Sequence, residues 1–241
     1  MKVYGISDIG KARSVNEDSY YLPGEGETFC AVADGMGGHN AGEVASALAI
    51  QSFAAAMQVS GHRDEEALHQ AVLQANKTVF SEASRDVHKR GMGTTFTALA
   101  EKDGTVHIAH VGDSRVYLIR NGAIMRVTMD HTLVEELVLE GVITVREARN
   151  HPQRHIVTRA LGMSEDVEVD LLQFEAREDD VFLLCSDGLT NMVEEREILE
   201  TTRGKGTWTD KLRTLVRIAL DAGGNDNITA LYVTFREEQH P

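Results

Sequence analysis

Proline, cysteine and tryptophan are scarce in this sequence, with three, two and one residues respectively among 241. The chain has neither a Pro/Ser-rich linker nor an internal repeat, so it offers no boundary at which to divide it. Apolar residues make up 42% of the chain, which is enough for a full core without disulfides. We therefore expect residues 1–241 to form a single domain.

The two cysteines, Cys30 and Cys185, each lie within an apolar run. This placement indicates buried free thiols in a reducing compartment, and it argues against a disulfide or a zinc site. No apolar stretch is long enough to span a membrane, and the first residues lack the apolar core of a signal sequence. We expect a cytoplasmic protein without a membrane partner.

Positive charge is also in short supply. The 24 Lys and Arg residues face 38 Asp and Glu residues, which gives a net charge of −14. So acidic a surface repels nucleic acid and anionic lipid, so neither is expected as a partner. Part of the negative charge is available for binding cations. No sequence pattern indicates a dimer interface, so we expect a monomer.

Helical periodicity is clearest at residues 68–79 and 208–219, where apolar residues recur at i, i+3, i+4 and i+7. An alanine-rich segment predicts a further helix at 41–57. Thr132 and Thr144 are each followed by Glu at the third position, a capping-box pattern that predicts two short helices between 132 and 150.

Strands are expected over most of the remaining chain. Asp103-Gly104 and Asn121-Gly122 supply hairpin turns within a run of four strands, which predicts an antiparallel meander at residues 94–100, 105–111, 115–120 and 123–128. Further strands are predicted at 2–8, 18–22, 28–33, 167–173, 180–185 and 228–235. Paired helices and clustered strands favour an α+β fold in which helices cover antiparallel sheets.

Acidic residues recur where strongly apolar strands end or begin. Asp34, Asp113 and Asp187 follow such strands, and Asp18 and Asp226 precede them. At any one site the simpler interpretation is ordinary turn chemistry, because Asp-Gly and Asn-Asp are common in turns. The repetition favours a second interpretation, in which strand ends on one side of a layered fold bring the carboxylates together.

Carboxylates gathered in one place need countercharge. Two unit charges about 4 Å apart repel by about 4 kcal/mol at an effective dielectric of about 20, and no Lys or Arg lies within three residues of Asp34, Asp187 or Asp226. Oxygen ligands select Mg²⁺, Mn²⁺ or Ca²⁺. We predict two ions bridged by Asp34, with the carbonyl of Gly35 turned toward one of them.

Two ions that share a hydroxide are suited to in-line attack on phosphorus. Arg13, which lies five residues before Asp18, adds the forked guanidinium that holds a phosphate dianion. The alternative for Arg13 is an ordinary surface arginine.

Seven stretches in this order resemble the bacterial type-2C, metal-dependent protein serine/threonine phosphatases. They are residues 13–18, 32–42, 92–95, 110–115, 130–132, 184–189 and 225–229. The resemblance extends from about residue 5 to residue 234. It implies a four-layer αββα sandwich, with two antiparallel sheets flanked by helix pairs and a metal cleft at one end. It also implies that a metal-bridged hydroxide hydrolyses phosphoserine and phosphothreonine on proteins in one in-line step, which reverses a bacterial serine/threonine kinase.

The resemblance further implies roles for individual residues. The direct ligands of two Mn²⁺ or Mg²⁺ ions are Asp34, Gly35 through its carbonyl, Asp187 and Asp226. Asp113, together with Asp187, would hold a third and weaker ion. Arg13 would bind the phosphate. Partners of metal-bound water would be Glu17 and Asp18, and Asn227 would order the loop around Asp226.

One position departs from the animal enzymes of this family, in which the Asp-Gly pair is followed by a histidine thought to protonate the leaving oxygen. Met36 stands at that position, and the nearest histidine is His39. His39 is therefore the candidate general acid. The alternatives are that His39 is a loop residue and that a metal-bound water donates the proton.

Residues 130–162 correspond to the flap of the family, a variable segment beside the metal cleft. Here it is rich in arginine, and we expect Arg154 and Arg159 to meet a phosphopeptide. The alternative is that these arginines pair with neighbouring acids on a solvated face.

Two other functions are considered beside the phosphatase. A non-catalytic phosphoprotein-binding module on the same fold would be favoured by missing ligands, yet Asp34, Asp187 and Asp226 are all present. A phosphatase of an anti-sigma antagonist in a partner-switching pathway usually carries a sensor domain, for which these 241 residues leave no room.

Overall fold

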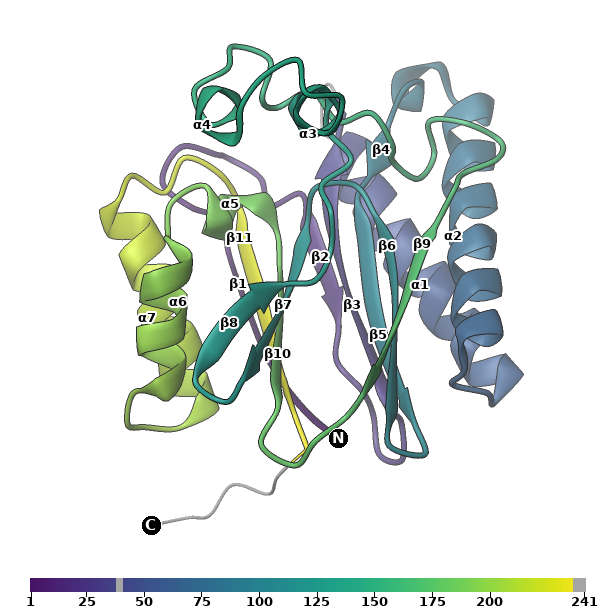
Figure 1. Ribbon diagram of the computed structural model, residues 1–241. Coiled ribbons are helices and arrows are strands. Elements are labelled where there is room, and N and C mark those ends of the chain that lie inside the picture. Colours follow the sequence, from purple (N-terminus) through teal and green to yellow (C-terminus); the bar gives the residue numbers. More distant parts are fainter. Residues whose placement is uncertain (38–40, 236–241) are drawn as a thin grey trace.

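Two antiparallel sheets face each other in the computed structural model, which describes residues 1–37 and 41–235 (Figure 1). The first sheet has the strand order β1 (Lys2–Asp8), β11 (Ile228–Thr234), β10 (Val181–Cys185), β7 (Arg115–Arg120) and β8 (Ala123–Arg126). The second has the order β2 (Asp18–Tyr21), β3 (Phe29–Met36), β5 (Phe96–Lys102), β6 (Thr105–Val111) and β9 (Asp170–Glu175), and β4 (Gly93–Thr94) pairs with β3.

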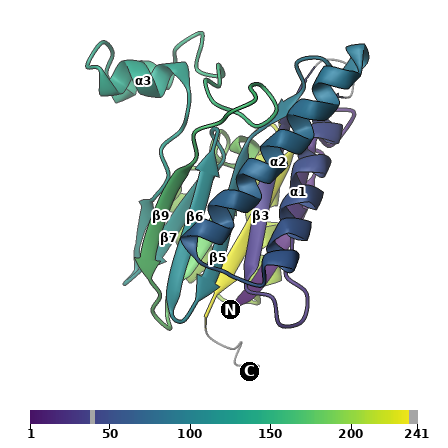
Figure 2. The same ribbon diagram turned by 90° about the vertical axis from the view of Figure 1, so that its right-hand side faces the viewer.

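Each sheet carries a pair of helices on its outer face. Figure 2 shows α1 (Ala41–Ser60) and α2 (Glu65–Arg85) lying side by side across the second sheet. The helices α6 (Glu195–Arg203) and α7 (Trp208–Asp221) cover the first sheet, and the short α5 (Asp187–Thr190) follows β10. This four-layer αββα sandwich confirms the predicted α+β fold.

Alternating strand residues fill the layers of the sandwich. Cys30 and Val32 of β3 meet Phe182 and Leu184 of β10 between the two sheets. The opposite faces of the strands pack against the helices, as the periodicity of α2 and α7 predicts. Cys30 and Cys185 are both buried and free, which confirms that they are buried thiols without a disulfide.

The helix α6 has no counterpart among the predicted elements. Only Ile198 and Thr202 of its residues are buried, so its apolar stripe is too narrow to show a helical period. The sequence signal for α6 is a capping pair at the start of the helix, where the Glu197 side chain accepts the backbone N–H of Glu194 (3.0 Å).

The predicted four-stranded meander is wrong. β5 and β6 form one hairpin in the second sheet, and β7 and β8 form another in the first sheet. Asp103 and Asn121 occupy the left-handed turn positions expected of the two hairpins. Between the hairpins the chain crosses from one sheet to the other at residues 112–114, where Gly112 has a φ of 110° that favours glycine. This crossing carries Asp113.

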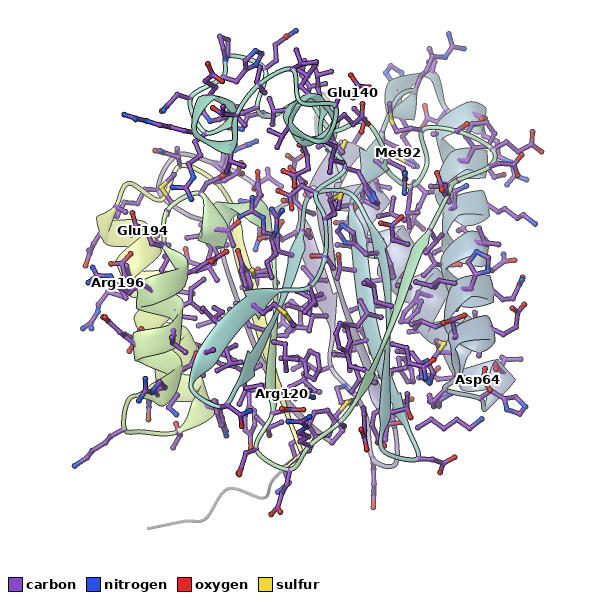
Figure 3. The ribbon with its side chains drawn as sticks, in the orientation of Figure 1. Asp64, Met92, Arg120, Glu140, Glu194 and Arg196 are labelled. Atoms are coloured by element: carbon purple, nitrogen blue, oxygen red, sulfur yellow. The ribbon has the colours of Figure 1, made fainter. Side chains whose placement is uncertain are left out.

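The flap contains α3 (Leu133–Leu139) and α4 (Val145–Ala148), which lie over one end of the sandwich (Figure 1). Thr132 and Thr144 cap the two helices, as predicted. Figure 3 shows Glu140 of the flap at one end of the molecule and Arg120 at the other, where Arg120 pairs with buried Asp180 at 2.6 Å. None of the helices in the described ranges is both long enough and apolar enough for a membrane span.

Candidate metal centre

Two aspartates oppose each other on neighbouring strands at the flap end. The register of β2 and β3 pairs Asp18 with Asp34. Like charges placed directly opposite in an antiparallel pair are destabilising. Thr95 fixes the backbone of Asp34 from the other side, because its Oγ1 accepts the Asp34 N–H (3.0 Å) and its own N–H donates to the Asp34 carbonyl (2.9 Å). The sheet therefore holds the two carboxylates together.

The first sheet contributes a second close pair, Asp187 and Asp226. A Cβ added at Gly188 would lie 1.9 Å from the carbonyl oxygen of Asn227 and 3.3 Å from the Cβ of Asp226. Only glycine allows this approach, so the Asp-Gly sequence brings the turn of Asp187 against Asp226. Within the part of the chain that the structure describes, Asp187 accepts one side-chain hydrogen bond, from Asn191 (3.0 Å).

Ser186 joins the two sheets at this end. It lies directly after β10, and its hydroxyl donates to Asp18 Oδ2 (2.7 Å) while accepting the N–H of Thr229 (3.0 Å). The other oxygen of Asp18 is buried and has no hydrogen-bond partner among the described residues. A buried acceptor without a partner costs free energy, so Asp18 Oδ1 marks a place for a further donor or a cation.

Asn227 organises the chain segment that precedes Asp18. Its side-chain oxygen accepts the N–H of Glu17 (2.8 Å), and its amide group donates to the carbonyls of Ile9 (2.9 Å) and Val15 (3.0 Å). The residue predicted to order the loop of Asp226 thus also fixes the segment that carries Arg13 and Glu17.

Arg13 supplies a cation that the local sequence around Asp226 lacks. Its guanidinium donates to Asp226 Oδ2 (2.9 Å) across a separation of 213 residues and lies 3.6 Å from Glu17. The Arg13 side chain is 46% exposed, so the pairing leaves part of the guanidinium accessible to a phosphate. Arg13 is therefore more than an isolated surface arginine.

The five aspartates at this end of the sandwich affect the pKa values of their acidic neighbours. Burial raises the pKa of Asp18 to about 7, with further upward contributions from Asp187 and Asp226. Burial likewise raises the pKa of Asp113 to about 8, followed by the charges of Asp187 and Asp130. The pKa of Asp34 is raised well above its ordinary value by burial and then by Asp18, Asp187, Asp113 and Asp226. The structure thus brings together carboxylates that are far apart in the sequence.

The side chains around this cluster do not neutralise it. Among residues 1–37 and 41–235, Asp34, Asp113 and Asp187 form no salt bridge, and Arg13 is paired with Asp226 and Glu17. No three His, Cys, Asp or Glu side chains in these ranges stand close enough to hold one ion without moving. Mutual repulsion keeps unshielded carboxylates apart, and the all-oxygen donor set with an orphaned Asp18 oxygen suits hard divalent cations. The residues fit such ions.

The flap adds one electrostatic contribution at Asp187, and its two arginines Arg154 and Arg159 have different surroundings. Burial and the charge of Asp226 raise the pKa of Asp187, whereas the hydrogen bond from Asn191 and the charge of His155 lower it. Arg154 is exposed, and only its backbone is hydrogen-bonded among the described residues. Arg159 pairs with Asp170 (2.7 Å) and Glu168 (3.1 Å), so the alternative of pairing with neighbouring acids applies to it.

Sequence reasoning placed Thr95 and Ser186 within the matching stretches but gave them no role. In the structure their hydroxyls hold Asp34 and Asp18. Their signal in the sequence is weak, although Ser186 directly precedes an Asp-Gly pair. His39, the candidate general acid, lies outside the described residues.

Comparison with known proteins places this arrangement in one family. Residues 10–231 match the family described as "Protein phosphatase 2C". The chain is similar to the serine/threonine phosphatase stp of Listeria monocytogenes, with 39% identity over 234 residues that cover 94% of this chain and 93% of the relative.

Solved structures of similar chains agree with this match. The Mycobacterium tuberculosis serine/threonine phosphatase PstP/Ppp has a TM-score of 0.90 at 39% identity, covering 98% of this chain and 99% of that one. A structure of the PstP catalytic domain in complex with two manganese ions has a TM-score of 0.86 at 38% identity, covering 96% of each chain.

Proposed function

Because the chain belongs to the protein phosphatase 2C family and is thus a metal-dependent serine/threonine protein phosphatase, we propose that its aspartate cluster binds two Mn²⁺ or Mg²⁺ ions for direct hydrolysis of phosphoserine and phosphothreonine. The proposed ligands are Asp34, the Gly35 carbonyl, Asp187 and Asp226, and Asp113 with Asp187 would hold a third, weaker ion. The observation that carries the proposal is the gathering of carboxylates at the flap end, where Asp34 stands opposite Asp18 and the Gly188 turn holds Asp187 against Asp226. These carboxylates have no sufficient countercharge among the described residues.

When bound, the ions would activate water and neutralise charge on the phosphoryl oxygens, which favours in-line attack in one step. The residues of the chain would hold that geometry. Thr95 fixes the backbone of Asp34, and the Gly188 turn keeps Asp187 against Asp226. Asp18 and Glu17 are proposed to orient water, with Ser186 and Asn227 holding their positions.

Arg13 is the proposed phosphate-binding group. Asp226 holds its guanidinium in place, and its planar fork of donors matches two phosphoryl oxygens. His39 stays the proposed general acid, with protonation by a metal-bound water as the alternative. Cys30 is buried between the two sheets and Cys185 between the first sheet and its helices. Burial raises the pKa of both thiols, so neither supports a covalent cysteine route.

We further infer that residues 1–241 act as one catalytic domain with the flap at 130–162, and that the substrates are proteins phosphorylated by a serine/threonine kinase. The non-catalytic binding module finds no support, because every proposed carboxylate ligand is present in the cluster.

Chelation tests the proposed dependence on divalent ions. Purified protein treated with EDTA is expected to lose all turnover of a phosphothreonine peptide, because no residue of the described cluster replaces the countercharge. Added Mn²⁺ or Mg²⁺ is expected to restore phosphate release, and Zn²⁺ is expected to restore less because it prefers nitrogen and sulfur ligands. Full turnover in EDTA after exhaustive dialysis would refute the proposal.

Arg154 is the flap arginine expected to contact a phosphopeptide, because Arg159 is already paired with Asp170 and Glu168. Substituting Arg154→Ala is expected to raise KM for phosphopeptides about tenfold and to leave KM for p-nitrophenyl phosphate unchanged, because only a peptide extends beyond the ions to the flap. Arg159→Ala is a different experiment, since it also frees the carboxylate of Asp170.

Steady-state kinetics with both substrates measures this difference. The matched control is Arg196→Ala, because Arg196 points away from the sandwich on α6 (Figure 3) and its side chain is 76% exposed. An equal loss on both substrates in the Arg154 variant would show that Arg154 has no role specific to peptides.

A further inference from the structure

Asp113 stands on the turn that crosses between the two sheets, and glycine makes this turn possible. Gly112 has a φ of 110°, and a Cβ added there would lie 2.6 Å from Cβ and Cγ2 of Thr95. Thr95 also hydrogen-bonds Ser114 on the other side of Asp113 (2.8 Å). The turn is therefore pressed against the residue that fixes Asp34, and small rotations of the Gly112 peptide groups would redirect Asp113.

His131 holds Gly112 in both directions. The backbone N–H of His131 donates to the Gly112 carbonyl (2.8 Å), and the N–H of Gly112 donates to His131 Nδ1 (3.0 Å). Two hydrogen bonds to one residue fix the peptide groups on both sides of it. The His131 side chain is only 7% exposed, so water does not readily replace the bond to Nδ1.

The other ring nitrogen of His131 reaches Asp170, the first residue of β9, which also binds Arg159 near the end of the flap. Since Nδ1 accepts the Gly112 N–H, the hydrogen-bond network assigns the ring proton to Nε2, which donates to Asp170 Oδ2 (3.1 Å). Arg159 of the flap holds the other oxygen of Asp170 (2.7 Å), and the N–H of Thr158 donates to the His131 carbonyl (2.8 Å).

We infer that His131 is a positioning residue that fixes the direction of Asp113 through Gly112 and ties that direction to Asp170 and, through it, to Arg159 near the end of the flap. The inference rests on the proposed function in one respect, the role of Asp113 as a metal ligand. The local claim, that the ring holds the Gly112 peptide, stands on the hydrogen bonds alone. Loosening this contact would weaken binding of the ion at Asp113 without removing any ligand.

Two conservative variants separate the two contacts of the ring. In His131→Asn the amide oxygen stands near the position of Nδ1, so the variant keeps an acceptor for Gly112 and loses Asp170. In His131→Gln the amide nitrogen stands near the position of Nε2, so the variant keeps a donor to Asp170 and loses the acceptor. The control is His107→Gln, which changes another buried histidine, in β6, that, among the described residues, forms no hydrogen bond with the crossing turn.

Hydrogen exchange of the Gly112 amide in EDTA-treated protein tests the local claim without any metal. The His131→Gln variant is expected to exchange about tenfold faster or more, because losing a hydrogen bond worth about 1.4 kcal/mol changes the opening equilibrium by that factor. The His131→Asn and His107→Gln variants are expected to retain wild-type protection. Equal exchange in all four proteins, or equal loss in both His131 variants, would overturn the inference.

Calorimetric titration with Mn²⁺ tests the link to Asp113. The weakest binding step is expected to weaken about tenfold in His131→Gln and to change less than threefold in His131→Asn, and in His131→Gln kcat is expected to fall at limiting Mn²⁺ while KM is kept. Asp113→Asn is measured in parallel. If Asp113→Asn leaves Mn²⁺ binding intact, the proposed third site fails, whereas the exchange experiment still decides the role of His131.

Discussion

The Asp34→Asn variant is expected to lower kcat by about three orders of magnitude or more and, at the same time, to raise the melting temperature of the metal-free protein. Asp34 faces Asp18 across the β2–β3 pair, and Asp187, Asp113 and Asp226 all raise its pKa further after burial. Asparagine keeps the shape and removes the charge. The proposed bridge between the ions is then lost, and a loss of about 4 kcal/mol in transition-state stabilisation corresponds to that fall in kcat.

The gain in stability has the same electrostatic origin as the loss of activity. In the metal-free folded protein Asp34 either carries its charge against its acidic neighbours or retains a proton that the unfolded chain releases, and asparagine removes both costs. The repulsion is on the order of 1–4 kcal/mol for a close pair of charges. A change of about 1 kcal/mol moves the melting temperature of a domain this large by about 2–4 °C. Differential scanning calorimetry in EDTA measures the shift, and turnover of a phosphopeptide in saturating Mn²⁺ measures kcat.

The control for this variant is Asp103→Asn, which removes the same charge from the β5–β6 hairpin turn. Asparagine tolerates the positive φ of 52° at Asp103, so neither stability nor activity is expected to change. A lower melting temperature for metal-free Asp34→Asn would contradict mutual repulsion, and near-normal kcat would remove Asp34 from the proposed ligands.

Metal-free protein is expected to lose stability as the pH rises from 6.5 to 8. Burial raises the pKa of Asp113 to about 8 from its ordinary 3.8, so the folded state retains a proton that the unfolded chain has released. Stability therefore falls with rising pH until the folded pKa is passed. Over this window Asp113 alone accounts for about 2 kcal/mol, and Asp34, whose pKa is raised in the same direction, adds to the fall.

The lower limit of the window follows from a buried histidine. Burial lowers the pKa of His110 to about 4 from its ordinary 6.5, so His110 makes the folded state more stable as the pH rises between these values. This contribution opposes that of the aspartates below pH 6.5 and is complete above it. The range from pH 6.5 to 8 therefore reports the aspartate cluster with little interference.

Thermal unfolding in EDTA at several pH values measures this dependence. Saturating Mn²⁺ is expected to remove most of the fall, because bound cations stabilise the ionised carboxylates and the folded state that binds them. The Asp34→Asn variant is expected to show a shallower fall than the parent. A melting temperature that stays constant or rises between pH 6.5 and 8 in EDTA would mean that the cluster does not retain protons.

Local sequence patterns predicted the positions of most elements. Apolar periodicity located α2 and α7, and the capping threonines located α3 and α4. These signals are local, because a helix or a strand records in its own residues which face it buries. The α6 helix was not predicted from the sequence because only two of its residues are buried.

The sequence by itself determined the α+β class, the free buried cysteines and the set of acidic residues at strand ends, because each depends on neighbouring residues only. The tertiary structure decided which sheet each hairpin joins, that Arg13 pairs with Asp226 across 213 residues, and that Arg159 is held by Asp170. An alternating strand pattern fixes the two faces of a strand and leaves its neighbours open. For that reason the crossing turn of Asp113, and the hydrogen bond from Gly112 of this turn to the His131 ring, are evident only in the folded chain.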